Sequence, residues 1–406
     1  MSSLAALYHL VTCAMWDKIT LGYFILLAAR SVAAADCTLA ASGSDDAPAF
    51  LAAAAECDTV TIPSDTTLNI STRMDMSTLS DTLIDLQGTI AFYPDIPYWS
   101  GNAFAFDFQD IITAWLLGGT NVTMSGGGTL DGLGQDWYDE AASNSTLLRP
   151  IILTIYHGDG VTIKDITMIN GPAWVNLAYE SNNVVYDNIT ITATSTSDNV
   201  ARNTDGWDTY RCDNVVIQNS VINNGDDCVS FKPNSTNILV SNLDCTGSHG
   251  ISVGSLGQYP EYYDIVENVT AIDIRMSKAS NGARIKAWAG PDVGSGIVRN
   301  ITFQNFIESE VDNPVIIDQC YGTDEDACAE YPSNTYIEDI YFKNITGTGT
   351  DSVVASIDCS PDGRCSNVNV DDLSLTGPDG DAEYVCENLE LSGNAVDLFS
   401  ECTYTA

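Results

Sequence analysis

Basic residues are scarce in this sequence. Fifteen Lys and Arg stand against 55 Asp and Glu among its 406 residues, and the formal net charge is −40. Such a charge repels nucleic acid and anionic membranes, so neither is expected as a partner. The excess of carboxylates indicates solubility and tolerance of an acidic medium. With 45% hydrophobic residues the chain has enough apolar surface for a large core, which excludes a disordered polymer.

Histidine is also scarce, and no two cysteines are close enough for a metal-binding knuckle. With three His and no CxxC motif, a zinc site is not expected. Most of the twelve cysteines fall into close pairs, a pattern typical of disulfides in an oxidising compartment. The predicted disulfides are Cys37–Cys57, Cys228–Cys245, Cys320–Cys328, Cys359–Cys365 and Cys386–Cys402. Cys212 is left over and is interpreted as a buried apolar residue, and Cys13 lies in the leader.

The sequence lacks a good membrane span. The apolar run within residues 18–35 is short and is interrupted by Arg30, but its lysine, apolar stretch and Ala-rich end predict a secretory signal. We expect a leader over residues 1–35 and a mature chain from near Asp36. Residues 1–14 fit no signal pattern, whereas a start at Met15 gives a signal of ordinary length, so we interpret them as a misassigned start.

A secreted, extracellular glycoprotein agrees with the number of N-x-S/T sequons. Some sequons arise by chance in a chain rich in Asn and Thr, so this evidence is weak alone. The predicted glycosylation sites are Asn69, Asn121, Asn144, Asn188, Asn234, Asn268, Asn300 and Asn344.

Short segments of β-type sequence recur along the chain. Within each segment β-branched residues alternate with polar ones, as in half-buried strands. The segments begin at residues 160, 183, 214, 237, 268, 300, 336 and 365. No linker divides residues 36–406, and stacked coils of short strands can share one core. The pattern predicts a single-domain, all-β, parallel β-helix in which a helix over residues 45–57 caps the first coil.

A propeller is the structural alternative. Its blades repeat every 40 to 50 residues or so and hold four strands each. The repeats here are shorter and hold two or three short strands, which favours the solenoid.

Four polar motifs follow one another at roughly one repeat each. They are NTDGWD at 203–208, GDDC at 225–228, GSHG at 247–250 and RIK at 284–286. Residues one coil apart in a solenoid lie above one another on the same face, so the motifs should form one patch. Taken singly, each motif is more typical of a turn or a solvated strand edge. Their joint spacing favours a functional site.

The patch combines the groups that glycosidic hydrolysis needs. Asp226 and Asp227 cannot both ionise cheaply beside Asp205, so one carboxyl should have a raised pKa and act as the acid. Arg284 and Lys286 alternate on a strand and can hold a substrate carboxylate. The spacings typical of calcium loops are absent, and the two cations would repel a metal.

Together these motifs resemble glycoside hydrolase family 28, the polygalacturonases, over nearly the whole mature chain. The matching residues are Asn203-Thr204-Asp205, Asp226-Asp227, His249-Gly250, Arg284-Ile285-Lys286 and Cys320-Tyr321-Gly322, and Ser248 departs from the Gly of many members.

The resemblance implies a right-handed parallel β-helix and inverting hydrolysis without a metal or organic cofactor. It implies that Asp226 is the proton donor, that Asp205 and Asp227 activate water, and that His249 tunes the donor. Asn203 belongs to the matched motif and is a further substrate-binding candidate. Arg284 and Lys286 would bind a galacturonate carboxylate, and Tyr321 would line the sugar site.

The stretches NTDGWD and GSHGISVGSLGQY resemble the exo-acting branch of the family, which releases single galacturonate units from a chain end. Exo action needs a pocket closed at one end, and the candidate walls are the aromatic segments 93–99, 134–138 and 258–263. Those aromatics could equally cap the core. We expect a monomer that acts on pectin-derived polygalacturonate.

Four alternatives remain open at the level of sequence. They are an exo-acting rhamnogalacturonan hydrolase, an endo-polygalacturonase, a pectate lyase and a catalytically silent pectin-binding solenoid. A lyase would need a calcium site, and the intact polar motifs disfavour a silent protein.

Overall fold

The computed structural model describes residues 35–404. The predicted leader, including Met15, Arg30 and Cys13, lies outside the described residues apart from Ala35. None of the helices within residues 35–404 is both long enough and apolar enough to cross a membrane.

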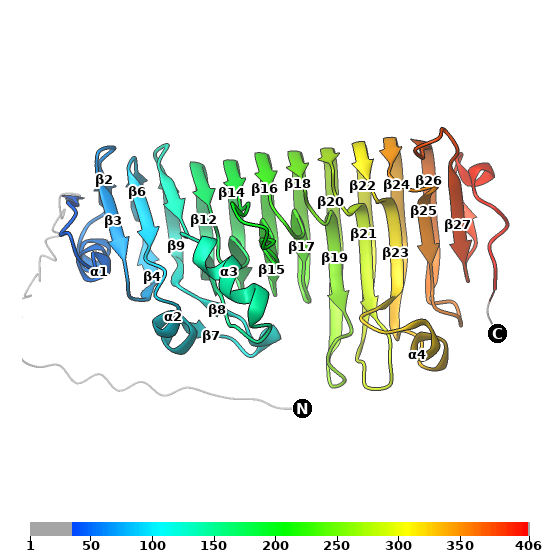
Figure 1. Ribbon diagram of the computed structural model, residues 1–406, viewed down its shortest axis with the longest axis horizontal. Coiled ribbons are helices and arrows are strands. Elements are labelled where there is room, and N and C mark those ends of the chain that lie inside the picture. Colours follow the sequence, from blue (N-terminus) through cyan, green and yellow to red (C-terminus); the bar gives the residue numbers. More distant parts are fainter. Residues whose placement is uncertain (1–34, 405–406) are drawn as a thin grey trace, which may run out of the picture. The chain divides into compact units, whose positions relative to one another are not determined.

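The main body is a right-handed parallel β-helix, in which one 25-stranded sheet winds along the chain (Figure 1). Successive coils pair in parallel, and each strand commonly contacts its equivalents two elements before and after it. The predicted fold class is therefore confirmed.

The strands of this sheet have the following bounds: β1 (Asp36–Thr38), β2 (Thr59–Ile62), β3 (Thr67–Ile70), β4 (Met74–Ser80), β5 (Leu83–Leu86), β6 (Thr89–Phe92), β9 (Trp115–Ser125), β10 (Thr129–Asp131), β12 (Leu153–Ile169), β13 (Asn176–Tyr179), β14 (Asn182–Thr192), β15 (Trp207–Tyr210), β16 (Asp213–Asn223), β17 (Val229–Phe231), β18 (Ser235–Thr246), β19 (Ile251–Leu256), β20 (Tyr263–Ser277), β21 (Asn281–Trp288), β22 (Ser295–Val311), β23 (Asn313–Tyr321), β24 (Thr335–Gly349), β25 (Val353–Asp358), β26 (Cys365–Thr376), β27 (Glu383–Glu387) and β28 (Leu391–Ser392). A second, three-stranded sheet is formed by β7 (Phe104–Ala105), β8 (Ile112–Thr113) and β11 (Pro150–Ile151).

The repeats seen in the sequence are the long strands β12, β14, β16, β18, β20, β22, β24 and β26. Their β-branched residues stack in register from coil to coil, and these side chains are almost completely buried. Because the interior positions are apolar in every coil, a shift of one residue would expose a whole row, which fixes the register. One such row is Val184, Val215, Ile238, Val269, Ile301, Ile340 and Val368.

Asparagine ladders mark the bends between strands. Asn268 donates from Nδ2 to Oδ1 of Asn237 at 3.0 Å, and Asn300 donates to Asn268 at 2.8 Å. All three have positive φ, between 55° and 59°, which Asn adopts more easily than most residues. Asn188 and Asn344 make similar bonds, to Asp165 and Asn305. Several of the predicted sequons thus lie at bends, and glycosylation of any of them stays a prediction.

A helix covers the first coil, as predicted. Helix α1 (Ala47–Glu56) buries Phe50 against Trp115, with the two rings edge to face at 5.5 Å. This contact protects the open edge of the first coil from other strands.

Short helices that no sequence pattern indicated accompany this cap. The structure also contains α2 (Ile96–Asn102), α3 (Gln135–Ser143) and α4 (Glu325–Glu330), with short 3₁₀ turns η1 (Phe108–Asp110) and η2 (Val396–Leu398). These helices are too short to show a helical period in the sequence. Helix α4 begins with a cap that could have been recognised, because Asp324 accepts from the Ala327 N–H at 2.9 Å.

The structure forms all five predicted disulfides. Cys212 is the free cysteine of the described chain, and it is buried. Burial raises the pKa of its thiol to about 12, so it remains a thiol at physiological pH. It packs within the core, in agreement with its interpretation as an apolar residue.

Glu308 is a buried acid inside the solenoid. The residue is 2% exposed, and neither carboxyl oxygen has a hydrogen-bond partner in the described chain. Its Oε1 lies so close to Gly282 that a Cβ there would be 1.9 Å away, which explains why the chain has glycine at this position. Burial raises the pKa of Glu308 well above its usual value, so the folded protein holds this group protonated.

We predict that Glu308→Gln flattens the pH dependence of stability. A raised folded-state pKa contributes stability below the unfolded pKa of about 4.3, and this contribution is lost as the pH rises through the folded value. The variant should therefore lose less stability than the native chain between pH 4 and 7, as measured by thermal unfolding. Glu310→Gln, at an exposed position on the same strand, is the matched control. Parallel curves for the native chain and Glu308→Gln would contradict the assignment.

Candidate active site

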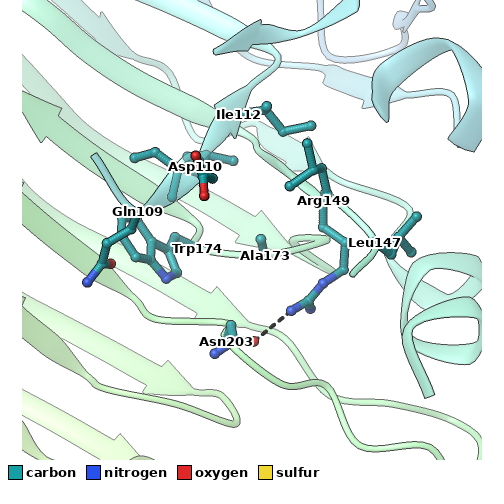
Figure 2. Close-up of a pocket in the computed structure, with 11 residues that line it drawn as sticks. Gln109, Asp110, Ile112, Leu147, Arg149, Ala173, Trp174 and Asn203 are labelled. Carbon is teal, nitrogen blue, oxygen red and sulfur yellow. Dashed lines mark hydrogen bonds between the residues drawn. The ribbon is translucent and has the colours of Figure 1, made fainter. Parts of the chain in front are cut away.

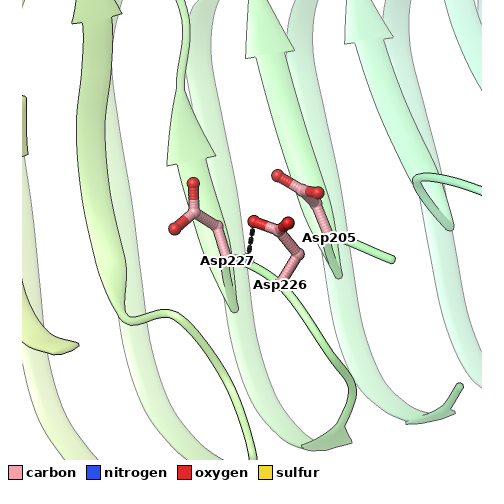
Figure 3. A group of neighbouring side chains, drawn as sticks. All are labelled: Asp205, Asp226 and Asp227. Carbon is pink, nitrogen blue, oxygen red and sulfur yellow. Dashed lines mark hydrogen bonds between the residues drawn. The ribbon is translucent and has the colours of Figure 1, made fainter. Parts of the chain in front are cut away.

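Four neighbouring strands carry the polar motifs at corresponding positions. The parallel register aligns Asp208 on β15 with Ser230 on β17, then with Ser252 on β19 and Arg284 on β21. NTDGWD, GDDC and GSHG lie at the starts of β15, β17 and β19, and RIK lies within β21, from which Lys286 contacts Asp227. The residues predicted from spacing do come together. Figure 3 shows the carboxyl groups of Asp205, Asp226 and Asp227 clustered where β15 and β17 begin.

The three carboxylates form a compact cluster. One oxygen of each lies within 4.8 Å of an oxygen of the others. The side chain of Asp226 is 17% exposed, whereas those of Asp205 and Asp227 are 3% and 1% exposed. Asp226 is therefore the carboxyl that a ligand in solution reaches first.

Asp227 is an ionised base held between two donors. Lys286 Nζ lies 2.7 Å from its Oδ2, and Ser252 Oγ donates to its Oδ1 at 2.7 Å. Burial alone would raise its pKa, but the positive charges of Lys286 and Lys232 outweigh burial and lower the pKa to about 2. The sequence predicted Lys286 but gave no reason to select Ser252.

Asp205 takes the opposite protonation state. Burial, with the nearby charges of Asp208 and Asp226, raises its pKa well above the usual range. The structure therefore supplies the raised carboxyl pKa expected from sequence, but places it on Asp205 rather than on one of the adjacent pair.

Lys232 and Asp208 lie behind this cluster. Lys232 Nζ is 3.2 Å from Asp208 and 4.0 Å from Asp205, and all three side chains are almost completely buried. Burial raises the pKa of Asp208 to about 7, while the neighbouring carboxylates raise that of Lys232 against the effect of burial. Asp208 is the last residue of the NTDGWD motif and Lys232 comes directly after β17, and sequence reasoning selected neither of them.

His249 contacts the exposed carboxyl of the cluster. Its Nδ1 lies 3.3 Å from Asp226 Oδ1. The hydrogen bond to Asp226 raises the pKa of His249, and burial opposes this shift without cancelling it. A protonated imidazole therefore sits beside Asp226 in mildly acidic solution.

A cationic surface on β21 adjoins the three carboxylates. The Arg284 guanidinium carbon and Lys286 Nζ lie 5.5 and 5.4 Å from the centre of the Tyr321 ring. The Nε of Arg284 is buried and makes no hydrogen bond within residues 35–404. Trp288 packs edge to face against Tyr321 at 5.4 Å and fixes its orientation. These side chains can bind an acidic sugar through charge and stacking.

The acidic cluster has its own compensating cations. Three carboxylates so close together could hold a metal ion, but the ammonium groups of Lys286 and Lys232 already lie against Asp227 and Asp205. A divalent ion at the cluster would be repelled by both.

One end of the site is bounded by a loop that sequence reasoning missed. Residues 104–113 lie over β13 and β15, where Phe106 and Phe108 stack on Tyr179 and Tyr210 at 4.4 and 4.1 Å. At the tip of the loop, Gln109 N–H donates to Tyr259 Oη at 3.0 Å, and Gln109 Nε2 donates to Gln258 Oε1 at 2.8 Å. Residues far apart in the sequence are thus joined across the site.

Of the three predicted walls, only segment 258–263 takes part in this closure. Trp99 of segment 93–99 and Trp137 of segment 134–138 belong to the main core and are each 1% exposed. Of the two interpretations left open by the sequence, capping of the core holds for Trp99 and Trp137, because a large apolar ring gains more by burial than by lining an aqueous pocket.

A pocket of about 260 Å³ lies beside this loop (Figure 2). Its lining includes Gln109, Arg149, Trp174 and Asn203. Arg149 Nη2 donates to Asn203 Oδ1 at 2.7 Å, and Asn203 Nδ2 lies 3.4 Å from Asp226 Oδ2. Arg149 lies outside every sequence motif, so only the fold brings it here.

A parallel β-helix with clustered carboxylates and cations on one face is the architecture of a polysaccharide-cleaving enzyme. Residues 53–397 match the sequence profile of Glycosyl hydrolases family 28. The chain belongs to this family of glycoside hydrolases.

Its relatives include exo-acting enzymes. An exopolygalacturonase of Cochliobolus carbonum is 46% identical over 365 residues, which cover 86% of this chain and 82% of that protein. Exopolygalacturonase X of Aspergillus niger is 45% identical over 381 residues, covering 90% and 87%.

A solved structure confirms the fold. The endo-xylogalacturonan hydrolase of Aspergillus tubingensis superposes with a TM-score of 0.83 at 34% identity, covering 92% of this chain and all of that one.

We predict that Ser252→Ala moves the acidic limb of the pH–rate profile upward by about one pH unit. The hydrogen bond from Ser252 stabilises the charged form of Asp227, so its loss raises the pKa of that carboxyl. Activity that needs ionised Asp227 is then lost at a higher pH, as kcat/KM measured against pH would show. Ser230→Ala is the control, because Ser230 occupies the neighbouring register position but donates to the Gly254 carbonyl. Identical acidic limbs in Ser252→Ala and Ser230→Ala would show that Ser252 does not lower the pKa of Asp227.

Proposed function

We propose that the protein is an exopolygalacturonase, which hydrolyses α-1,4 galacturonosidic bonds from the end of de-esterified pectin chains and releases galacturonate. The observation that carries this proposal is the Asp205–Asp226–Asp227 cluster flanked by cations and bounded by the loop of residues 104–113. The names of the relatives and the family membership support it.

Asp226 is the proton donor in this proposal. It is the most exposed carboxyl of the cluster, so it can contact the leaving oxygen. Protonated His249 at 3.3 Å stabilises Asp226 after the proton has left. In this proposal the proton moves from the Asp226 carboxyl to the glycosidic oxygen as the glycosidic bond breaks.

Asp227 and Asp205 prepare the attacking water. Asp227 is ionised by Lys286 and accepts a proton from water, while Asp205 orients that water from the neighbouring strand. Arg284, Lys286 and Tyr321 bind the sugar on the leaving-group side through its carboxylate and ring. Asn203 holds Asp226 in line with the sugar in the adjoining pocket.

We propose inversion at the anomeric carbon, although oxygen distances within 4.8 Å are shorter than the roughly 6.5–9.5 Å between carboxyl groups in most inverting enzymes. Asp205 and Asp227 form a pair that can hold one water between them, and both oxygens of Asp227 are engaged by Ser252 and Lys286. A carboxylate held in this way is better suited to act as a general base than as a nucleophile. Proton NMR of the first product would show the β anomer, and an α anomer would refute inversion.

The closing loop supports exo rather than endo action. Gln109 joins Tyr259 and Gln258 across the surface beyond the pocket, so a chain end fits there but a continuing chain does not. Secretion, glycosylation at the eight sequons and a monomeric state belong to the same proposal.

Product analysis separates the alternatives. Polygalacturonate at mildly acidic pH should yield free galacturonate while viscosity stays high. A rapid fall in viscosity would indicate an endo enzyme. Activity on rhamnogalacturonan fragments alone would make rhamnogalacturonan the substrate. Ultraviolet-absorbing unsaturated products that need calcium would indicate a lyase.

We predict that Asp226→Asn lowers kcat on polygalacturonate by about 10²- to 10⁴-fold, because the amide cannot donate the proton. Asp198→Asn removes the same charge at an exposed position and should retain activity. Thermal unfolding of both variants checks the fold. Near-normal turnover by Asp226→Asn would rule out its role as the acid.

A further inference from the structure

The pocket lined by Gln109, Arg149, Trp174 and Asn203 contains a positive charge that the mechanism above does not use. We propose that this pocket binds the terminal uronate of the chain and that Arg149 binds the carboxylate of that sugar. The proposal rests on the proposed function and extends it by assigning the residue that selects an acidic chain end.

The pocket adjoins the reacting carboxylates on two sides. Asn203 connects Arg149 to Asp226 through bonds of 2.7 and 3.4 Å. The ring of Trp174 lies 4.9 Å from Lys232 Nζ, and Lys232 pairs with Asp208 and approaches Asp205. A sugar in the pocket would therefore have its anomeric carbon at the cluster.

Its size suits one sugar ring. The volume of about 260 Å³ is below the roughly 300–1,000 Å³ of pockets that enclose drug-sized ligands. The bond from Gln109 to Tyr259 restrains the loop at the pocket's edge. One ring fits between Trp174 and the loop, which agrees with removal of a single unit.

Arg149 is a charged donor without a charged partner. Its guanidinium donates to the carbonyl oxygens of Pro172 at 3.0 Å and Arg202 at 2.6 Å, and to Asn203. No carboxylate within residues 35–404 lies within 4.0 Å of it. Guanidinium has five N–H donors, and these three bonds fix its plane while leaving donors for a ligand. Arg remains protonated although burial lowers its pKa.

The position of Arg149 relative to the other cations defines the substrate. Arg284 and Lys286 lie on β21, several coils beyond β13 and β15, whereas Arg149 reaches the cluster from the opposite side, before β12. The two sugars on either side of the cleaved bond would thus each meet a cation. A chain of consecutive uronates satisfies both sites, whereas a chain alternating acidic and neutral sugars satisfies only one.

Asp110 is the negative group of the pocket lining. Figure 2 shows its carboxyl on the side of the pocket away from the Arg149 guanidinium. From there it can accept hydrogen bonds from sugar hydroxyls, while the carboxylate of the sugar turns to Arg149. The opposite charges give the ring one favoured orientation.

The test compares two trisaccharides. One is trigalacturonate, and the other has its non-reducing terminal carboxyl reduced to the neutral alcohol. The native protein should prefer the acidic terminus by about 10- to 100-fold in kcat/KM, the usual effect of one charge-assisted contact. Arg149→Gln also breaks the bond to Asn203, so the test is the ratio between the two substrates: the variant should lose about 10- to 100-fold more activity on trigalacturonate than on the neutral-ended trimer. Arg149→Lys keeps the positive charge but cannot form two parallel hydrogen bonds to a carboxylate, so it should restore part of the preference.

The outcomes separate this proposal from the proposed function. If the native protein cleaves neither trimer, the proposed function fails. If it cleaves both equally well, the function stands and the carboxylate site is overturned. Equal losses on both trimers in Arg149→Gln would also overturn it, because Arg149 would then act only by positioning Asn203 and Asp226. Arg202→Gln, an exposed neighbour, controls for general charge and should keep the preference, and loss of the preference there would exclude a specific contact at Arg149.

Discussion

The stacking of parallel coils in fixed register is the constraint on which the site depends. Rows of β-branched residues fill the interior, and a shift by one residue would turn each of them outward. The same register aligns Asp208, Ser230, Ser252 and Arg284 on neighbouring strands. The apolar core thus determines which polar side chains meet, although none of those side chains belongs to it.

Burial then separates the properties of carboxyl groups that are chemically identical. Asp227 stays ionised because the charges of Lys286 and Lys232 outweigh burial, whereas burial and the nearby charges of Asp208 and Asp226 raise the pKa of Asp205. A chain with 55 acidic residues can therefore present a local surface that attracts an acidic polymer. Arg149, Arg284 and Lys286 lie around the cluster, where little solvent screens them.

The loops determine how a chain enters the site. Parallel coils alone form an open groove, in which a long polymer could bind at any point. The contact between Gln109 and Tyr259 turns one end of that groove into a pocket of about 260 Å³. The fold that this protein shares with an endo-acting relative is therefore compatible with exo action, because closure depends on segments outside the repeated coils.

The sequence alone predicted the solenoid, the capping helix, the five disulfides and the four motifs at one site, because each follows from a short pattern or a regular spacing. It could not select Arg149 or Gln109, since neither belongs to a repeat, and it left open whether Trp99 and Trp137 line a pocket or cap the core, because their burial depends on packing. The protonation states of Asp205 and Asp227 were also decided by tertiary structure. Charge, burial and distance between residues of different coils set those states, and only the folded chain brings these residues together.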